Sequence, residues 1–202
     1  MERAASEAWR IAVLTSGHGR GSNLRALYKA FTNNSLPLKI AFATASSGKA
    51  PVVQLCSDLG LPCHILNPRY QESFENRLLE LCQQEQIDLV ALAGFMRLLS
   101  PAFLDQAGIP VLNIHPALLP KYGGQGMYGI RVHEAVFAAG ERFSGATVHL
   151  VDPIYDHGEI IAQEQVDISD CHSPEAIAAK VLEIEHGIYA RAIYDFLSRK
   201  TT

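Results

Sequence analysis

A nearly continuous apolar run between residues 87 and 93 constrains the fold of this chain more than any other feature. Only Asp88 interrupts it. Strands that read as continuous apolar runs are buried on both faces, and they occur in parallel sheets that helices cover on both sides. The run therefore predicts an α/β protein built on a parallel sheet.

The neighbouring segments alternate between short apolar stretches and amphipathic ones, which is typical of βαβ units. Strands are expected at residues 11–15, 38–43, 61–66, 87–93, 111–115, 144–151 and 159–166. Helices are expected at residues 24–31, 52–59, 71–85, 102–107, 131–139 and 173–197. We expect a single doubly wound, mostly parallel, Rossmann-like sheet with an antiparallel edge strand, in a domain over residues 11–198 that follows an N-terminal extension over residues 1–10.

Composition excludes several classes of protein. The net charge of -4 argues against bulk binding to nucleic acid. No apolar run approaches the roughly 20 residues of a membrane helix, and residues 1–10 carry no apolar stretch of a secretory signal. The four cysteines lack the spacing of a metal site or a disulfide framework, so we expect no metal and a cytoplasmic setting with free thiols.

Two polar side chains interrupt the apolar strand expected at residues 111–115. Asn113 and His115 are two positions apart, so they project from the same face of the strand. Pro116 cannot donate to a strand ladder and ends the strand. Open α/β sheets bind ligands at the carboxyl ends of their strands. These residues alone fit either a ligand site or a strand end at which His115 caps a loop and Asn113 bonds backbone.

A glycine-rich loop at residues 16–23 joins the first expected strand to the first expected helix. This arrangement points free backbone N–H groups at an anion. A dinucleotide loop does not fit, because Ser22 stands where the third glycine would be and no acid follows the second strand. A kinase-type P-loop fails at Lys49, which is followed by alanine. Two interpretations remain: a loop that binds phosphate without a nucleotide-binding motif, and a glycine turn that binds no ligand.

Two irregular segments follow expected strands. Residues 94–101 place an aromatic residue, a methionine and an arginine after the apolar run. This segment fits either a packed turn with one surface arginine or an apolar ligand pocket with a cation at its entrance. Four glycines between residues 123 and 129 exclude regular structure there and predict a mobile loop.

Four stretches of the chain match the motifs of one enzyme family: Ala93–Pro101, Leu112–Pro120, Gly145–His149 and the Asp156-x-Gly158 pair. Together they resemble phosphoribosylglycinamide formyltransferase, the folate-dependent enzyme of purine biosynthesis. The resemblance extends from about residue 11 to residue 197. The Gly-Ser-Asn loop and the Glu185-His186 pair narrow it to this member among the formyltransferases. We expect neither the C-terminal barrel of methionyl-tRNA formyltransferases nor the N-terminal regulatory domain of formyltetrahydrofolate hydrolases.

The resemblance implies a mechanism. In that family the glycinamide amine attacks the formyl carbon of 10-formyltetrahydrofolate, and a tetrahedral intermediate with an oxyanion forms. Asn113 and His115 correspond to donors to that oxygen, and such donors commonly contribute on the order of 3 kcal/mol each. Asp156 corresponds to the family's carboxylate, which would favour a charged imidazolium and assist proton transfer from the amine.

The resemblance also implies the residues that bind the two small-molecule substrates. Gly21, Ser22, Asn23 and Glu185 correspond to the phosphoribosylglycinamide site. The expected folate pocket comprises Met96, Arg97, Leu98, Leu99, Asn113 and the backbone of Asp152, Pro153, Ile154 and Tyr155. Arg97 is the expected cation for a folate carboxylate, since its planar fork pairs two oxygens. We expect 10-formyltetrahydrofolate as cosubstrate, no nucleic-acid or membrane partner, and a monomer or homodimer.

The chain departs from the family pattern at several positions. Its loop at residues 16–23 is two residues longer than Ser-Gly-x-Gly-Ser-Asn, and Arg20 adds a cation beside the expected phosphate. The asparagine that is familiar after the second strand is missing at residues 44–46, and His157 replaces a small residue. Among the histidines we expect a buried partner of the site at His149, ligand-facing positions at His18 and His157, and surface or structural positions at His64, His133 and His172.

Two other functions fit parts of the pattern. A hydrolase would release formate from the same folate by admitting water to the site of Asn113, His115 and Asp156. A binding protein would hold a ribonucleotide or a folate without turnover. The acceptor site of Gly21, Ser22, Asn23 and Glu185 argues for transfer. The complete set of three polar groups argues against binding alone, because binding needs no group for proton transfer.

Overall fold

The computed structural model describes residues 8–16, 19–33 and 36–199. In this part of the chain, seven strands form one sheet in the order β3-β2-β1-β4-β5-β6-β7, which confirms the predicted α/β fold. The chain divides into two compact units, Met1–Val111 and Leu112–Thr202. Antiparallel pairing is confined to the second unit, where β6 runs antiparallel to both β5 and β7.

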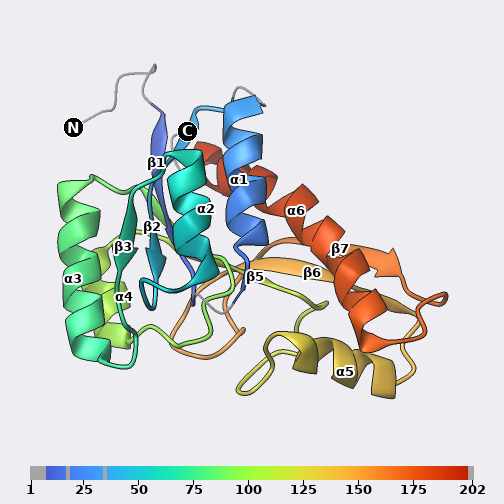
Figure 1. The fold of residues 1–202 in the computed structure, drawn as a ribbon. Helices are drawn as coiled ribbons and strands as arrows, with labels where there is room; N and C mark the ends of the chain where they lie inside the picture. The colour runs from blue at the N-terminus through green and yellow to red at the C-terminus, as the bar shows by residue number, and fades with distance from the viewer. Residues whose placement is uncertain (1–7, 17–18, 34–35, 200–202) are drawn as a thin grey trace. The chain divides into compact units, whose positions relative to one another are not determined.

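The first unit is a parallel βαβ array (Figure 1). Its strands are β1 (Trp9–Leu14), β2 (Leu38–Ala45), β3 (Cys63–Ile65) and β4 (Leu89–Leu92). Its helices are α1 (Ser22–Asn33), α2 (Pro51–Leu59), α3 (Gln71–Gln84) and α4 (Pro101–Ala107). All four residues of β4 are buried, as the continuous apolar run predicted. The loops that follow these parallel strands therefore lie at the carboxyl edge of this unit's sheet.

Local signals explain where several elements begin and end. Pro51 opens α2, and Gly60 ends it in the left-handed conformation. Leu61 then donates its N–H to the Cys56 carbonyl, which keeps it in the helix cap. For that reason β3 is shorter than the predicted 61–66 and begins only at Cys63. The other predicted boundaries agree with the structure to within two residues.

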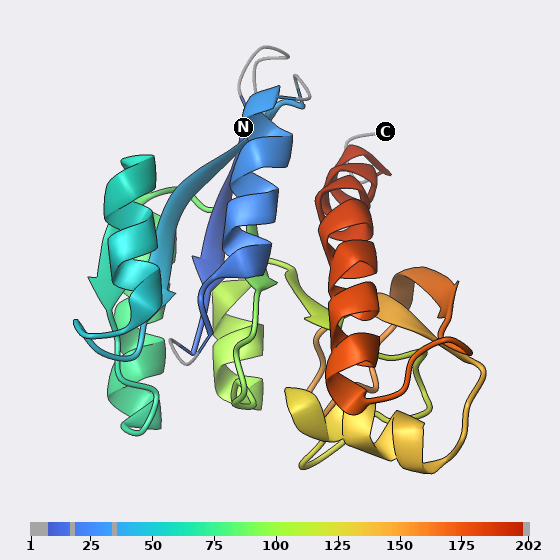
Figure 2. The same cartoon turned by 45° about the vertical axis from the view of Figure 1, so that its right-hand side comes forward.

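The second unit combines three strands with two helices. They are β5 (Val111–His115), which begins at the unit boundary, β6 (Phe143–Leu150), β7 (Ile160–Asp167), α5 (Ile130–Ala138) and α6 (Pro174–Arg199). Helix α6 packs against β6, β7 and α5 (Figure 2). The buried Tyr189 of α6 donates its hydroxyl to the Leu112 carbonyl at 2.9 Å, which ties α6 to β5. Between β5 and α5 the chain forms neither strand nor helix, as the glycines predicted.

The pairing of β5 with β6 fixes which side chains face each other. Asn113 pairs with His149, and His115 pairs with Thr147. On the other side of β6, Gly145 lies so close to β7 that a Cβ atom would stand 2.0 Å from the Glu164 carbonyl oxygen. Only glycine fits there, so the antiparallel pair can form only in a register that places Gly145 at this contact.

Candidate active site

The structure brings the three predicted catalytic residues together in the second unit. The Nδ1 atom of His115 lies 3.5 Å from Oδ2 of Asp156. Asn113 joins through His149, whose Nε2 lies 3.1 Å from the Asn113 amide nitrogen and 3.6 Å from Oδ1 of Asp156. We call Asn113, His115, His149 and Asp156 the polar cluster. It is buried, with His115 3% and His149 2% exposed.

Two adjacent strands and one turn position the cluster. Asn113 and His115 come from the end of β5, and His149 comes from the paired residue of β6. Asp156 lies in the turn that follows β6 and has a positive φ of 53°. This conformation is uncommon for a residue with a side chain, and such strain is concentrated at functional sites. The turn thus directs a carboxylate back toward the strand ends.

Backbone groups of the loop between β5 and α5, residues 116–129, hold two members of the cluster. The Tyr122 carbonyl lies 2.8 Å from His115 Nε2. A carbonyl can only accept, so Nε2 carries the hydrogen, and Nδ1 of the neutral ring presents a lone pair toward Asp156. The Gly124 N–H donates to Oδ2 of Asp156 at 2.9 Å. In this arrangement the first residues of the loop cover the two groups that would move protons.

His149 fixes the orientation of the Asn113 amide. Its Nδ1 lies 3.0 Å from the Leu150 carbonyl, so the neutral ring carries its hydrogen on Nδ1. Nε2 is then an acceptor for the amide N–H of Asn113 at 3.1 Å. His149 is therefore buried, as expected, and contacts Asn113. One amide hydrogen of Asn113 is taken by this contact, and the other is left to donate elsewhere.

Burial and charge set the protonation states. Burial lowers the pKa of His115, against the opposing effects of the Asp156 charge and the Tyr122 carbonyl. Burial alone would raise the pKa of Asp156, but its contacts with His149, His115 and the Gly124 N–H together lower it. The resting cluster is thus a neutral imidazole beside an ionised carboxylate. A proton that arrives at His115 Nδ1 would form an ion pair with Asp156, which suits transient proton storage.

A second hydrogen-bonded group supports the turn after His115. The buried hydroxyl of Thr147 donates to the Ala117 carbonyl at 2.7 Å and accepts the Leu119 N–H at 3.1 Å. Gln163 of β7 donates to the Leu119 carbonyl at 3.0 Å and to the Thr147 hydroxyl at 2.8 Å. Neither this role of Gln163 nor the part played by the Tyr122 carbonyl was foreseen from the sequence. The contact of a backbone carbonyl does not depend on the residue type, so the sequence cannot indicate it. A glutamine in a strand with many polar residues is most simply read as solvent-exposed.

The predicted phosphate loop lies in the first unit. Gly21 has a φ of 72°, and a Cβ atom there would stand 2.7 Å from a methyl carbon of Leu55. Its carbonyl accepts the N–H of Arg25 at 2.9 Å, so Gly21 opens α1 and Ser22 and Asn23 form the first turn. The loop therefore ends at a helix N-terminus, as predicted. His18, which we expect to face a ligand, lies outside the described residues.

The predicted folate residues fall into two segments. In the first unit, Met96 is 39% exposed, Arg97 is exposed and Leu99 is buried at 1%. In the second unit, the loop Asp152–Tyr155 follows β6, and the Asp152 carboxylate accepts the Ile154 N–H at 2.8 Å. The other Asp152 oxygen lies 2.7 Å from His157 Nδ1, which draws that histidine to the loop.

The remaining predicted residues take defined places in the second unit. Glu185 is buried in α6 at 8% exposure. His133 is buried in α5, so it is structural rather than a surface residue. Within the described ranges, no group of His, Cys, Asp and Glu side chains could hold a metal ion. None of the helices described is long and apolar enough to cross a membrane.

Comparison with known proteins places this chain in one class. The model of a family described as formyl transferase matches residues 9–193. The chain therefore belongs to the formyl transferase family.

Several relatives of similar length carry the name phosphoribosylglycinamide formyltransferase. Phosphoribosylglycinamide formyltransferase of Bacillus subtilis is 31% identical, over 93% of this chain and 94% of that protein. The Escherichia coli protein of the same name is 33% identical, over 91% of this chain and 84% of its own. A crystal structure of the Bacillus halodurans protein superposes with a TM-score of 0.84 at 31% identity, and the match covers 95% of this chain and 96% of that one. Within the family, the chain belongs with the phosphoribosylglycinamide formyltransferases.

Two plant relatives are longer than the matched region. The chloroplastic proteins of Vigna unguiculata and Arabidopsis thaliana are 35% and 32% identical to this chain. The chain spans 59% and 64% of their lengths.

The buried His133 makes stability depend on pH. Burial, with a smaller effect of His115, lowers the pKa of His133 from 6.5 to about 4. The native state then binds fewer protons than the unfolded state between these values, so stability falls as the pH drops through that window. The loss attributable to His133 is roughly 3 kcal/mol. Replacing His133 by Gln should flatten the pH dependence of the free energy of unfolding, measured in urea from pH 7 to pH 4.

The matched control is His172→Gln, which removes an exposed histidine from the same unit. It should leave the wild-type pH dependence intact. An unchanged slope in His133→Gln would mean that another group controls acid unfolding.

Proposed function

We propose that this protein transfers the formyl group of 10-formyltetrahydrofolate to the amine of phosphoribosylglycinamide, a step of purine biosynthesis. The polar cluster is the observation that carries the proposal. It pairs a neutral imidazole and a primary amide with a carboxylate that stays ionised, in a chain of the phosphoribosylglycinamide formyltransferases. Formyl transfer to an amine needs hydrogen-bond donors for an oxyanion and a group that moves a proton, and this cluster contains both.

In the proposed mechanism, Asn113 and His115 donate to the formyl oxygen. The Tyr122 carbonyl, 2.8 Å from His115 Nε2, marks where a carbonyl oxygen can accept this hydrogen bond. The formyl oxygen would take that place when the loop shifts. Negative charge develops on it as the amine adds to the formyl carbon, and both donors strengthen at that moment.

Proton transfer completes the reaction. A bond forms between the amine nitrogen and the formyl carbon, the bond from that carbon to N10 of the folate breaks, and one proton passes from the amine to N10. Asp156 assists removal of the proton, and His115 holds positive charge beside it. The low pKa of Asp156 keeps it available as a base at neutral pH.

The substrate-binding residues complete the proposal. Gly21, Ser22 and Asn23 would bind the phosphate through backbone N–H groups at the start of α1, a setting that favours anions. Glu185 would bind the ribonucleotide. The folate would contact Met96, Arg97, Leu98 and Leu99, Asn113, and the backbone of Asp152, Pro153, Ile154 and Tyr155.

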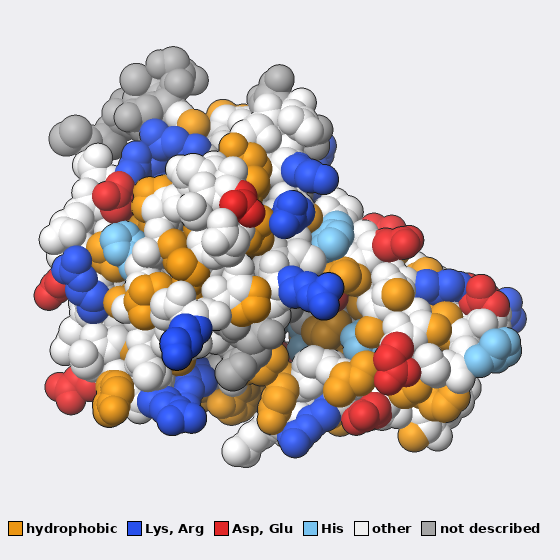
Figure 3. Space-filling model, in the orientation of Figure 1, with side chains coloured by type: hydrophobic (Ala, Val, Ile, Leu, Met, Phe, Trp, Pro, Cys, Tyr) orange, Lys and Arg blue, Asp and Glu red, His pale blue; other side chains and the backbone are white. Residues whose placement is uncertain are grey.

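The two small molecules are the only partners in the proposal, and the proposed domain covers residues 11–198. On the face drawn in Figure 3, basic side chains are interspersed with acidic and apolar ones. A nucleic-acid site would instead gather them in one stripe. We propose a cytoplasmic enzyme, in keeping with its free cysteines.

A turnover assay tests the function. Wild-type protein should deformylate 10-formyltetrahydrofolate only when phosphoribosylglycinamide is present, and the formylated ribonucleotide should accumulate at the same rate. Deformylation that needs no acceptor would favour a hydrolase. Binding of both compounds without turnover would favour a binding protein.

Arg20 offers a separate test of the phosphate loop. It is exposed and directly precedes Gly21. Replacing Arg20 by Ala should raise the KM for the ribonucleotide roughly tenfold, the effect of one charge-assisted hydrogen bond, and leave the KM for the folate nearly unchanged. Lys29→Ala, which removes an exposed cation from α1, is the control. Equal ribonucleotide KM values in both variants would show that Arg20 only faces solvent.

A further inference from the structure

The segment that joins β4 to α4, residues 93–100, presents its middle to solvent and is held at both ends. At its start, the Ala93 N–H donates to the Leu14 carbonyl at 2.9 Å. At its end, Ser100 caps α4 by accepting the Phe103 N–H at 3.1 Å. Between these points Met96 and Arg97 are exposed. The position of these two side chains therefore depends on what holds the 93–100 segment.

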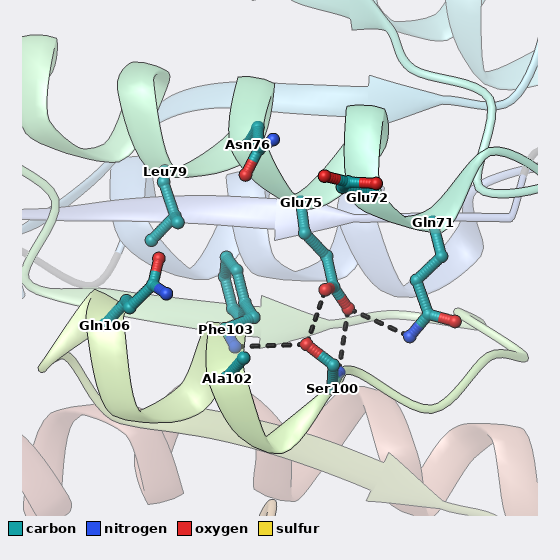
Figure 4. Close-up of a pocket in the computed structure, with 9 residues that line it drawn as sticks. All are labelled: Gln71, Glu72, Glu75, Asn76, Leu79, Ser100, Ala102, Phe103 and Gln106. Atoms are coloured by element: carbon teal, nitrogen blue, oxygen red, sulfur yellow. Dashed lines mark hydrogen bonds between the residues drawn. The ribbon is translucent and has the colours of Figure 1, made fainter.

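The first turns of α3 supply three of the contacts that hold it. The ring of Phe74 stacks on Phe95, with centroids 5.5 Å apart and planes 18° apart. Gln71 donates its amide to the Leu98 carbonyl at 3.3 Å. Glu75 contacts Ser100 (Figure 4). Gln71 lies one turn before the adjacent residues Phe74 and Glu75 on α3, so one helix face holds the segment at three points.

Glu75 has an unusual setting for a carboxylate. It is only 7% exposed, and within the described part of the chain no Lys or Arg forms an ion pair with it. Instead it accepts the Ser100 N–H at 2.7 Å, the Ser100 hydroxyl at 2.5 Å and the Gln71 amide at 3.1 Å. A buried polar group is costly unless hydrogen bonds compensate it. Here the compensating groups belong to the residue that ends the 93–100 segment and to its neighbour on α3.

We propose that Glu75, with Gln71, is a positioning residue that sets where Arg97 and its neighbours meet the folate. The inference rests on the proposed function, in which Arg97 pairs with a folate carboxylate. Bidentate pairing of a guanidinium with a carboxylate depends on geometry, so a small displacement of the segment would weaken it. Glu75 itself touches no substrate. It acts on folate affinity through Ser100 and Leu98.

Replacing Glu75 by Leu tests the inference. Leucine is of similar size but accepts no hydrogen bond, so the Ser100 N–H loses its partner. The Kd of 10-formyltetrahydrofolate, measured by calorimetry without acceptor, should rise about tenfold. The KM for the ribonucleotide and kcat at saturating folate should stay within about twofold. Glu75→Gln should recover most of the affinity, because its amide oxygen can accept the Ser100 N–H and its NH₂ group can donate to the Ser100 hydroxyl.

Two controls separate positioning from stability. Asn76→Ala alters the next residue of α3, which lines the same groove of about 440 Å³ between α3 and α4 without a bond to the segment (Figure 4). Arg10→Met removes the contacts of Arg10 with Glu85 in the same unit and should lower the Tm without changing folate affinity. A Glu75→Leu protein with a lower Tm and an unchanged folate Kd would overturn the inference, since Glu75 would then serve only the stability of the unit by holding Ser100, the N-cap of α4.

Other outcomes are equally decisive. If Glu75→Leu does not fold, Gln71→Ala removes the hydrogen bonds to the Leu98 carbonyl and to Glu75 but leaves both Ser100 contacts of Glu75, and it should raise the folate Kd about threefold. No change in that variant would overturn the inference. If the wild type binds formyl folate and both variants bind it with the same Kd, the positioning role alone would be contradicted. Wild-type protein that binds no formyl folate would overturn the proposed function as well.

Discussion

Replacing Asp156 by Asn is expected to lower kcat by about 10²–10⁴-fold, the range of a group that moves a proton in the transition state. The amide keeps the size of the side chain but carries no charge. It can neither accept the proton of the amine nor stabilise a charged His115, 3.5 Å away. Steady-state kinetics should show KM values within a few-fold of wild type.

The matched control is Asp167→Asn, which removes a carboxylate that pairs with Arg142 on the surface of the same unit. It should keep wild-type turnover. If Asp156→Asn turned over at a similar rate, Asp156 would have no part in proton transfer.

Replacing His115 by Ala is expected to lower kcat by about 10³-fold, because it removes an oxyanion donor and the group that holds positive charge beside Asp156. Substrate affinity should change far less. His115→Gln can still donate one hydrogen bond but cannot take up a proton, so it should lie between Ala and the wild type. His64→Gln, a histidine of β3 in the first unit, is the control.

The double variant of His115→Ala and Asp156→Asn adds a test of joint action. Residues that act as a unit give non-additive losses. The double variant should therefore be hardly slower than the worse single variant. Fully multiplicative losses would mean that the two residues act in separate steps.

Much of the fold was predictable because its signals are local. The apolar run of β4 predicted burial on both faces, and Pro51 with Gly60 bounded α2. β3 was predicted too long because apolar residues at 61–62 read as strand, whereas a backbone hydrogen bond to Cys56 keeps Leu61 in the helix cap. Propensity contains no information on that contact.

The candidate site was predictable only in part. Spacing within one strand was enough to group Asn113 with His115, and the structure confirms that they join one cluster. Asp156 could be placed only through the family resemblance, since an acid before a turn glycine is ordinary. The Tyr122 carbonyl and the Gly124 N–H depend on the path of an irregular loop, which no residue pattern encodes.

His133 shows a signal that the sequence did contain. Its position three residues before Val136 places both on the buried face of α5, where Val132 also lies. The expectation left open whether His133 is a surface or a structural residue, and helical periodicity favours the buried, structural position that the structure shows. The consequence is the pH-dependent stability predicted for this unit.

The close contact at Gly145 also limits how this protein can change in length. Side chains alternate between the two faces of a strand, so one residue gained or lost between Gly145 and His149 would turn His149 away from Asn113. If His149 kept its place instead, Gly145 would shift, and a residue with a side chain there would bring its Cβ atom 2.0 Å from the Glu164 carbonyl oxygen. Insertions and deletions should therefore be tolerated in the turn before β6 but not inside β6 between Gly145 and His149. Variants lengthened in the turn should fold, and variants lengthened inside β6 should not.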